Sequence, residues 1–102
     1  MPTFGEIIKK YREERQLPLR TVASYLDIDQ AVLSKMEHNK RTATKEQVKQ
    51  LAKYFNANEK ELLILWISDR VVYEIKDEEF ATDALKLAEQ EIKYLTKKNG
   101  KK

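Results

Sequence analysis

The residues best suited to chemistry form a basic stretch between residues 30 and 49. Five bases, namely Lys35, Lys40, Arg41, Lys45 and Lys49, stand there against two glutamates, which gives a net charge of +3. Residues 69–91 are acidic, with eight carboxylates against three bases, and the last eleven residues carry five lysines and no acid. Clustered Lys and Arg side chains attract polyanions such as nucleic acid, although solvated helix faces would also explain a charge run taken alone.

Catalytic and metal chemistry have little support in the composition. The chain has no Cys and one His, which excludes disulfide scaffolds, zinc clusters and cysteine nucleophiles. Gly5 and Gly100 are the two glycines, too few for a phosphate-cradling loop. We interpret His38 as an exposed loop residue and residues 77–79 as a helix start favoured by the helix dipole. We therefore expect no enzyme, no cofactor and no metal site.

The composition suits one small all-α protein. Of the 102 residues, 41% are apolar and 36% charged, with only 2 Gly and 2 Pro, so a core can form and helix breakers are rare. The longest apolar run, Leu62 to Ile67, is too short to cross a bilayer, and the N-terminus shows no signal-peptide pattern. We expect a soluble, cytoplasmic protein without a membrane partner.

Capping patterns and apolar spacing predict where the helices lie. Thr3 with Glu6 and Thr44 with Gln47 have the spacing of capping boxes, which opens helices at about residues 4 and 45. Pro18 suits the first turn of a second helix. The predicted buried stripes are Ile7, Ile8 and Tyr11; Val22, Ala23 and Leu26; Leu33 and Met36; Val48, Leu51, Ala52 and Phe55; and Leu62 with Leu63.

A short turn at residues 27–29 joins the second predicted helix to the third, which covers about residues 30–37. Asp27 tolerates a left-handed conformation, Ile28 fills the turn, and Asp29 suits the N-cap. Asn39 is a second left-handed candidate, at the end of the third helix. Asn58 with Glu61 repeats the capping-box spacing and opens the fifth helix.

Beyond residue 63 the chain becomes apolar on all sides and then forms a heptad seam. We interpret Trp66 as core rather than as a base-stacking platform, because its neighbours are aliphatic. In the last helix, Ala81, Leu85, Ala88, Ile92 and Leu95 recur at spacings of 4, 3, 4 and 3. We expect a first domain at 1–63, a helical dimerisation extension at 64–98 and a disordered basic tail at 99–102.

An ordered set of residues carries a family resemblance across residues 4–63. The set comprises Ile8, Arg12, Leu17, Val22, Ala23 and Leu26; the turn 27–29; Leu33 to Glu37; the basic loop 39–41; and Leu51, Ala52, Phe55, Asn58, Glu61, Leu62 and Leu63. This stretch resembles the phage-repressor and Cro type of helix-turn-helix protein, the XRE family. The resemblance implies a five-helix, lambda-repressor-like DNA-binding domain, here followed by two C-terminal helices. It also implies an ion pair between Arg12 and Glu37 that ties the first helix to the third.

The resemblance implies a role for each group at the DNA surface. Base edges would be read by Gln30, Ala31, Val32 and Lys35. Phosphates would be held by Arg20, Thr21, Ser34, Asn39, Lys40 and Arg41. The sequence departs from the family at Leu19, where a glutamine often clamps a phosphate, and at Asp27, where glycine is usual.

The expected function is sequence-specific regulation of transcription by a homodimer on a near-palindromic operator in double-stranded DNA. Phage repressors and restriction–modification controllers are candidates within the family, and the protein would associate with the nucleoid when bound. The expected dimer surface comprises Leu65, Trp66, Val72, Tyr73, Leu85, Ile92 and Leu95. Two alternatives stay open. The segment 64–95 can fold back on its own domain, and the chain can be an antitoxin-like interaction module with secondary DNA binding.

Overall fold

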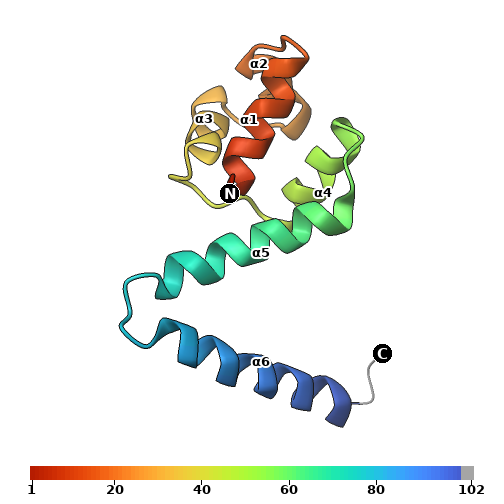
Figure 1. Cartoon of the computed structure of the whole chain (residues 1–102). Coiled ribbons are helices and arrows are strands. Elements are labelled where there is room, and N and C mark those ends of the chain that lie inside the picture. The colour runs from red at the N-terminus through yellow and green to blue at the C-terminus, as the bar shows by residue number, and fades with distance from the viewer. Residues whose placement is uncertain (100–102) are drawn as a thin grey trace. The chain divides into compact units, whose positions relative to one another are not determined.

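The computed structural model describes residues 1–99, which contain six α-helices and no strand (Figure 1). The helices are α1 (Phe4–Glu14), α2 (Leu19–Leu26), α3 (Gln30–Glu37), α4 (Lys45–Tyr54), α5 (Glu59–Ile75) and α6 (Ala81–Lys98). The chain divides into two units, Met1–Arg70 and a second that begins at Val71. The all-α prediction is therefore confirmed for the part of the chain that the structure describes.

One hydrophobic core holds the first unit together. Helix α3 packs against both α1 and α2, and α4 packs against α2. The buried apolar residues are Phe4, Ile8, Val22, Ala23, Leu26, Leu33, Met36, Ala43, Val48, Leu51, Ala52, Phe55, Leu62 and Trp66. Every stripe predicted from helical spacing contributes to this core, with Ile7, Tyr11, Ile28 and Leu63 half-buried against it. The sequence patterns thus place the interior correctly.

The first four helices all end in the same way, in a residue with a left-handed backbone. Gln16, Asp27, Asn39 and Asn56 have φ values of 54°, 58°, 62° and 53°. In each case the following N–H donates to a carbonyl five residues back, as Ile28 does to Ala23 at 3.0 Å. This Schellman geometry satisfies carbonyl groups that a helix end otherwise leaves unpaired. The left-handed conformations predicted for Asp27 and Asn39 are confirmed.

The helix starts agree with the predicted cap positions. Full capping boxes form at Thr3 with Glu6 and at Thr44 with Gln47, and Asn58 Oδ1 accepts the N–H of Glu61 at 2.9 Å. Asp29 occupies the N-cap position of α3 as predicted, but its side chain makes no capping hydrogen bond. The N–H of Val32 donates instead to the backbone carbonyl of Asp29 at 3.0 Å. This bond, of the 3₁₀ type, occupies the donor that a capping side chain would take.

The predicted arrangement of five helices followed by two is replaced by six helices within residues 1–99. The fifth predicted helix and the next one form a single helix, α5, because no Gly or Pro interrupts residues 59–75. The first unit also extends past residue 63. Trp66 is buried in its core, and the carboxylate of Asp69 accepts the N–H of Phe4 at 2.7 Å, which adds a tertiary cap to α1.

The second unit consists of the end of α5, a turn and α6. No residue of α6 is buried, and Ala81 is its one half-buried residue. Asn99 ends the helix, and its N–H donates to the carbonyl of Leu95 at 3.0 Å. The rest of the predicted basic tail, residues 100–102, lies outside the described residues.

Gly5 is required where α1 begins beside the end of α3. A Cβ added at this position would clash with the carbonyl oxygens of Met36 and Glu37, and it would lie 2.8 Å from Asn39 Oδ1. Backbone carbonyls cannot swing aside as a flexible side chain can. The close approach of the two helices therefore depends on a residue without a side chain.

We predict that Gly5→Ala lowers the free energy of unfolding by about 1–3 kcal/mol, because the two helices must separate to admit the methyl group. Chemical denaturation followed by circular dichroism measures this change. Lys10→Ala, on the exposed side of the same helix, is the matched control and changes stability by less than about 0.5 kcal/mol. Equal stability of the two variants would contradict the packing described here.

Candidate nucleic-acid interface

Helix α3 has one face in the core and one face toward solvent. Leu33, Met36 and Glu37 are buried, whereas Gln30, Ala31 and Lys35 are exposed. Because residues one turn apart share a helix face, the three exposed residues form a continuous outward surface with Ser34 between them. The exposed surface has one base, one amide and one methyl group, a combination suited to contacts with the edges of nucleobases.

Two residues predicted for the interface do not point freely outward. Val32 is half-buried and packs against the core, so only part of its side chain faces outward. Ser34 is also half-buried. Val32 lies on the border between the two faces of a helix only eight residues long, and its contact with a base stays a prediction.

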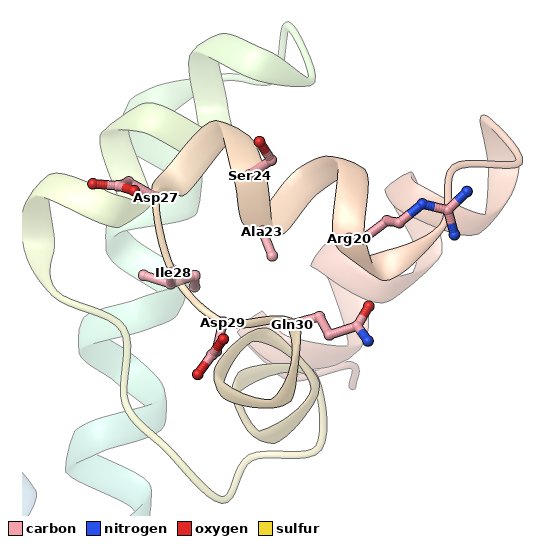
Figure 2. Close-up of a pocket in the computed structure, with 7 residues that line it drawn as sticks. All are labelled: Arg20, Ala23, Ser24, Asp27, Ile28, Asp29 and Gln30. Atoms are coloured by element: carbon pink, nitrogen blue, oxygen red, sulfur yellow. The ribbon is translucent and has the colours of Figure 1, made fainter.

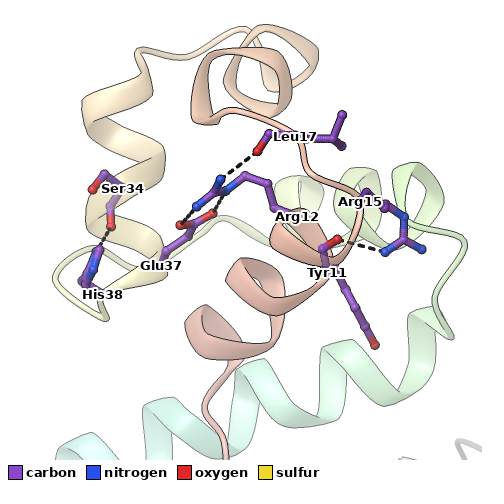
Figure 3. Close-up of polar contacts among 7 residues, drawn as sticks. All are labelled: Tyr11, Arg12, Arg15, Leu17, Ser34, Glu37 and His38. Carbon is purple, nitrogen blue, oxygen red and sulfur yellow. Dashed lines mark hydrogen bonds and ion pairs between the residues drawn. The ribbon is translucent and has the colours of Figure 1, made fainter.

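A buried ion pair fixes α3 against α1. Arg12 Nε lies 2.7 Å from Glu37 Oε2 and Arg12 Nη2 lies 3.0 Å from Glu37 Oε1, while Nη1 donates to the carbonyl of Leu17 at 2.8 Å (Figure 3). Glu37 is only 3% exposed. The hydrogen bond to Glu37 raises the pKa of Arg12 above its usual range. The pair implied by the family resemblance is present, and it also holds the connection between α1 and α2.

An open depression lies where α2, the turn and α3 meet. It has a volume of about 500 Å³ and is lined by Arg20, Ala23, Ser24, Asp27, Ile28, Asp29 and Gln30. Figure 2 shows Arg20 and Gln30 extending toward the same side, with the Asp27 carboxylate at the opposite end. The two side chains offer cationic and amide donors side by side, which suits a phosphate next to a base edge.

The basic loop between α3 and α4 exposes its polar side chains and anchors its far end. Asn39, Lys40 and Arg41 are all exposed. Ala43 is buried, and its carbonyl accepts the indole N–H of Trp66 at 2.9 Å. This bond joins α5 to the loop across 23 residues of sequence. It therefore fixes the loop at Ala43, away from the charged side chains of Lys40 and Arg41.

His38 ends α3 as an exposed residue. Its Nδ1–H donates to the carbonyl oxygen of Ser34 at 2.8 Å (Figure 3). Within residues 1–99, no three His, Asp or Glu side chains gather as a metal site. No helix in the same residues is both long and apolar enough to span a membrane.

The residues predicted for the dimer surface divide into two groups. Trp66 is buried, as its interpretation as core requires, so it is not free for a partner, and Leu65 is half-buried against the core. The remaining five, Val72, Tyr73, Leu85, Ile92 and Leu95, are exposed. Sequence reasoning missed the structural roles of Gly5, Ala43 and Asp69. Of the three, only Gly5 had a signal in the sequence, namely a glycine in the first turn of a predicted helix.

Comparison with known families agrees with this geometry. The family model described as "Helix-turn-helix domain" matches residues 5–65, more than half of the 102-residue chain. The chain belongs to the helix-turn-helix domain family. No curated protein and no solved structure matches it.

Membership of the helix-turn-helix family supports DNA binding by a regulator. The matched range includes α1 to α4 almost entirely and the first part of α5, and therefore the turn, the outward face of α3 and the basic loop. Helix α6 lies beyond the matched range.

We predict that Glu37→Gln and Arg12→Met each lower the free energy of unfolding by about 2–4 kcal/mol, because each leaves a desolvated partner. In a double-mutant cycle, the two changes should show a coupling of at least about 1 kcal/mol. Glu13, which is exposed and next to Arg12, gives the matched control: Glu13→Gln with Arg12→Met should couple by less than about 0.5 kcal/mol. Strictly additive losses for Arg12 and Glu37 would contradict the tie between α1 and α3.

Proposed function

We propose that the chain is a transcriptional regulator of the Cro and phage-repressor type that binds a near-palindromic operator as a homodimer. The observation that carries the proposal is the exposed face of α3, with Gln30, Ala31 and Lys35, on a domain whose family match spans α3, the turn before it and the basic loop after it. The regulator would act by occupying its operator and would carry out no catalysis.

The residues of α3 that would recognise DNA bases lie along its exposed face. In helix-turn-helix complexes the second helix of the motif enters the major groove with its N-terminal residues at base edges. Gln30 can pair with adenine through two hydrogen bonds, Lys35 can donate to guanine, and Ala31 can contact a thymine methyl. The half-buried position of Val32 leaves it a supporting role.

Phosphate contacts would surround this readout surface. The candidates are Arg20 and Thr21 at the start of α2, Ser34 on α3, and Asn39, Lys40 and Arg41 in the basic loop. Such contacts set the register of the protein on the duplex but read no sequence. The anchoring of Ala43 by Trp66 supports this role, because a fixed loop loses less entropy when it binds.

Two copies are needed for useful discrimination, since one helix-turn-helix unit reads only a half-site in a genome full of competing sequences. A two-fold dimer places two α3 helices about 34 Å apart, or a small multiple of that distance, in successive major grooves. A phage repressor and a restriction–modification controller would both use this arrangement, and the genes that flank this one distinguish them.

An antitoxin-like interaction module is the second candidate, favoured by the exposed apolar side chains of α6. Such a module would co-purify stably with a protein encoded by a neighbouring gene. The regulator we propose binds DNA without that protein, and its affinity falls as the salt concentration rises.

We predict that Lys35→Ala and Gln30→Ala weaken binding to the best operator by about 1–3 kcal/mol and leave binding to random DNA nearly unchanged. Arg41→Ala should weaken binding to all sequences alike and reduce the salt slope by about one. Fluorescence anisotropy at several salt concentrations measures both quantities. Lys60→Ala, an exposed lysine on α5, is the control and should have no effect on affinity for the operator. A Lys35→Ala variant that weakened random DNA and the operator equally would make Lys35 a phosphate contact.

A further inference from the structure

Helix α6 is long and apolar on one side, yet it has nothing to pack against in its own unit. None of its 18 residues is buried, and Leu85, Ile92 and Leu95 are 45%, 63% and 51% exposed. An isolated helix of this length is marginally stable in water, because most helix stability in proteins comes from a packed apolar face. A surface that covers the seam formed by Ala81, Leu85, Ala88, Ile92 and Leu95 is therefore needed.

The charges of this segment indicate what covers the seam. The first turn of α6 carries one acid, Asp83, and no base, whereas its last turn carries Lys97 and Lys98 and no acid. A second copy of the same helix, running in the opposite direction, places the acidic end of each against the basic end of the other. The helix dipoles also oppose each other in that orientation. A parallel pair would place like charges together at both ends.

The sizes of the seam residues favour the same orientation. In a parallel pair in register, Ala88 faces Ala88 of the partner subunit and leaves a gap between two layers of large side chains. In an antiparallel pair whose two-fold axis crosses α6 at the level of Gln90, Ala88 faces Ile92 of the partner subunit. Leu85 then faces Leu95 of the partner subunit. Facing a small residue with a large one fills the space evenly.

One feature of α6 opposes antiparallel pairing. A two-fold axis near Gln90 places Glu89 opposite Glu91 of the partner subunit, which is a like-charge contact made twice. Lys93 Nζ lies 3.3 Å from Glu89 Oε2 on the same helix, and its positive charge offsets part of that repulsion. The pair is exposed and therefore screened by solvent. The burial of Leu85, Ile92 and Leu95 from each copy outweighs it, since each large apolar side chain contributes more than an exposed charge contact.

We propose that α6 pairs in antiparallel orientation with α6 of a second copy of this chain. This contact rests on the proposed function, which supplies the two copies of the homodimer. It lies in a segment outside the range that the helix-turn-helix family model matches. The contact comprises the seam residues Leu85, Ala88, Ile92 and Leu95 from both copies.

The absence of cysteine allows a direct test of orientation in the full chain. Thr82→Cys and Thr96→Cys, both at exposed positions that flank the seam, are made as separate variants. The two positions are about 21 Å apart along one helix. A short bifunctional maleimide cannot span that distance, so the cysteines that it joins reveal the orientation of the pair. A mixture of the two variants should cross-link to a covalent dimer, and neither variant should cross-link by itself. Cross-linking of each variant with itself would mean a parallel pair and would overturn the proposal.

A second experiment tests the seam itself by sedimentation of the full chain. Leu85→Glu with Ile92→Glu should raise the dimer dissociation constant by on the order of 100-fold or more, whereas Gln90→Glu, on the opposite face of α6, should leave it unchanged. Circular dichroism shows whether the first unit stays folded, which we expect because both seam residues are exposed in the single chain.

The outcomes separate this proposal from the proposed function. A dimer that survives the two glutamates, or that fails to cross-link in the mixture, uses another surface and overturns the α6 contact alone. A monomeric wild-type chain overturns both the α6 contact and the homodimer. A chain that cross-links as expected but binds no DNA supports the α6 contact and overturns the proposed regulator.

Discussion

The buried pair of Arg12 and Glu37 is the interaction on which the DNA-binding unit depends. Helix α3 has only eight residues, too few to hold a helix by itself. Its last residue carries a carboxylate with a side chain 1% exposed, and burying an unpaired charge would be costly. Arg12 meets both oxygens and adds a bond to Leu17, so one guanidinium fixes α3, α1 and the connection to α2. The close contact at Gly5 ties the same end of α3 to the start of α1.

Local patterns in the sequence predicted most of the first unit. Capping boxes, apolar stripes and left-handed residues each depend on neighbours within a few positions, and those at Thr3, Thr44, Asp27 and Asn39 are present in the structure. Long-range contacts have no such signal. The bond from Trp66 to Ala43 and the cap that Asp69 gives to Phe4 join residues 23 and 65 positions apart. Neither can be deduced from spacing, because each depends on how α5 lies across the unit.

The departures from the sequence predictions have equally specific causes. Asp29 occupies the predicted N-cap of α3, but the N–H of Val32 donates to its backbone carbonyl and not to its side chain. Val32, a predicted base contact, lies at the border of a short helix and packs in part against the core. The sequence predictions place Trp66 both in the core and on the dimer surface, and in the structure it is buried in the core. What stays outward on α3 is a smaller set, Gln30, Ala31 and Lys35, with Ser34 between them.

Selection of binding sites from a pool of random duplex DNA tests the central claim most directly, because it asks whether the outward face of α3 reads sequence in two copies. The account predicts enrichment of an inverted repeat whose half-sites are centred about one helical turn, or a small multiple of it, apart. Recovery of no preferred sequence, with an affinity set by salt concentration alone, would contradict it.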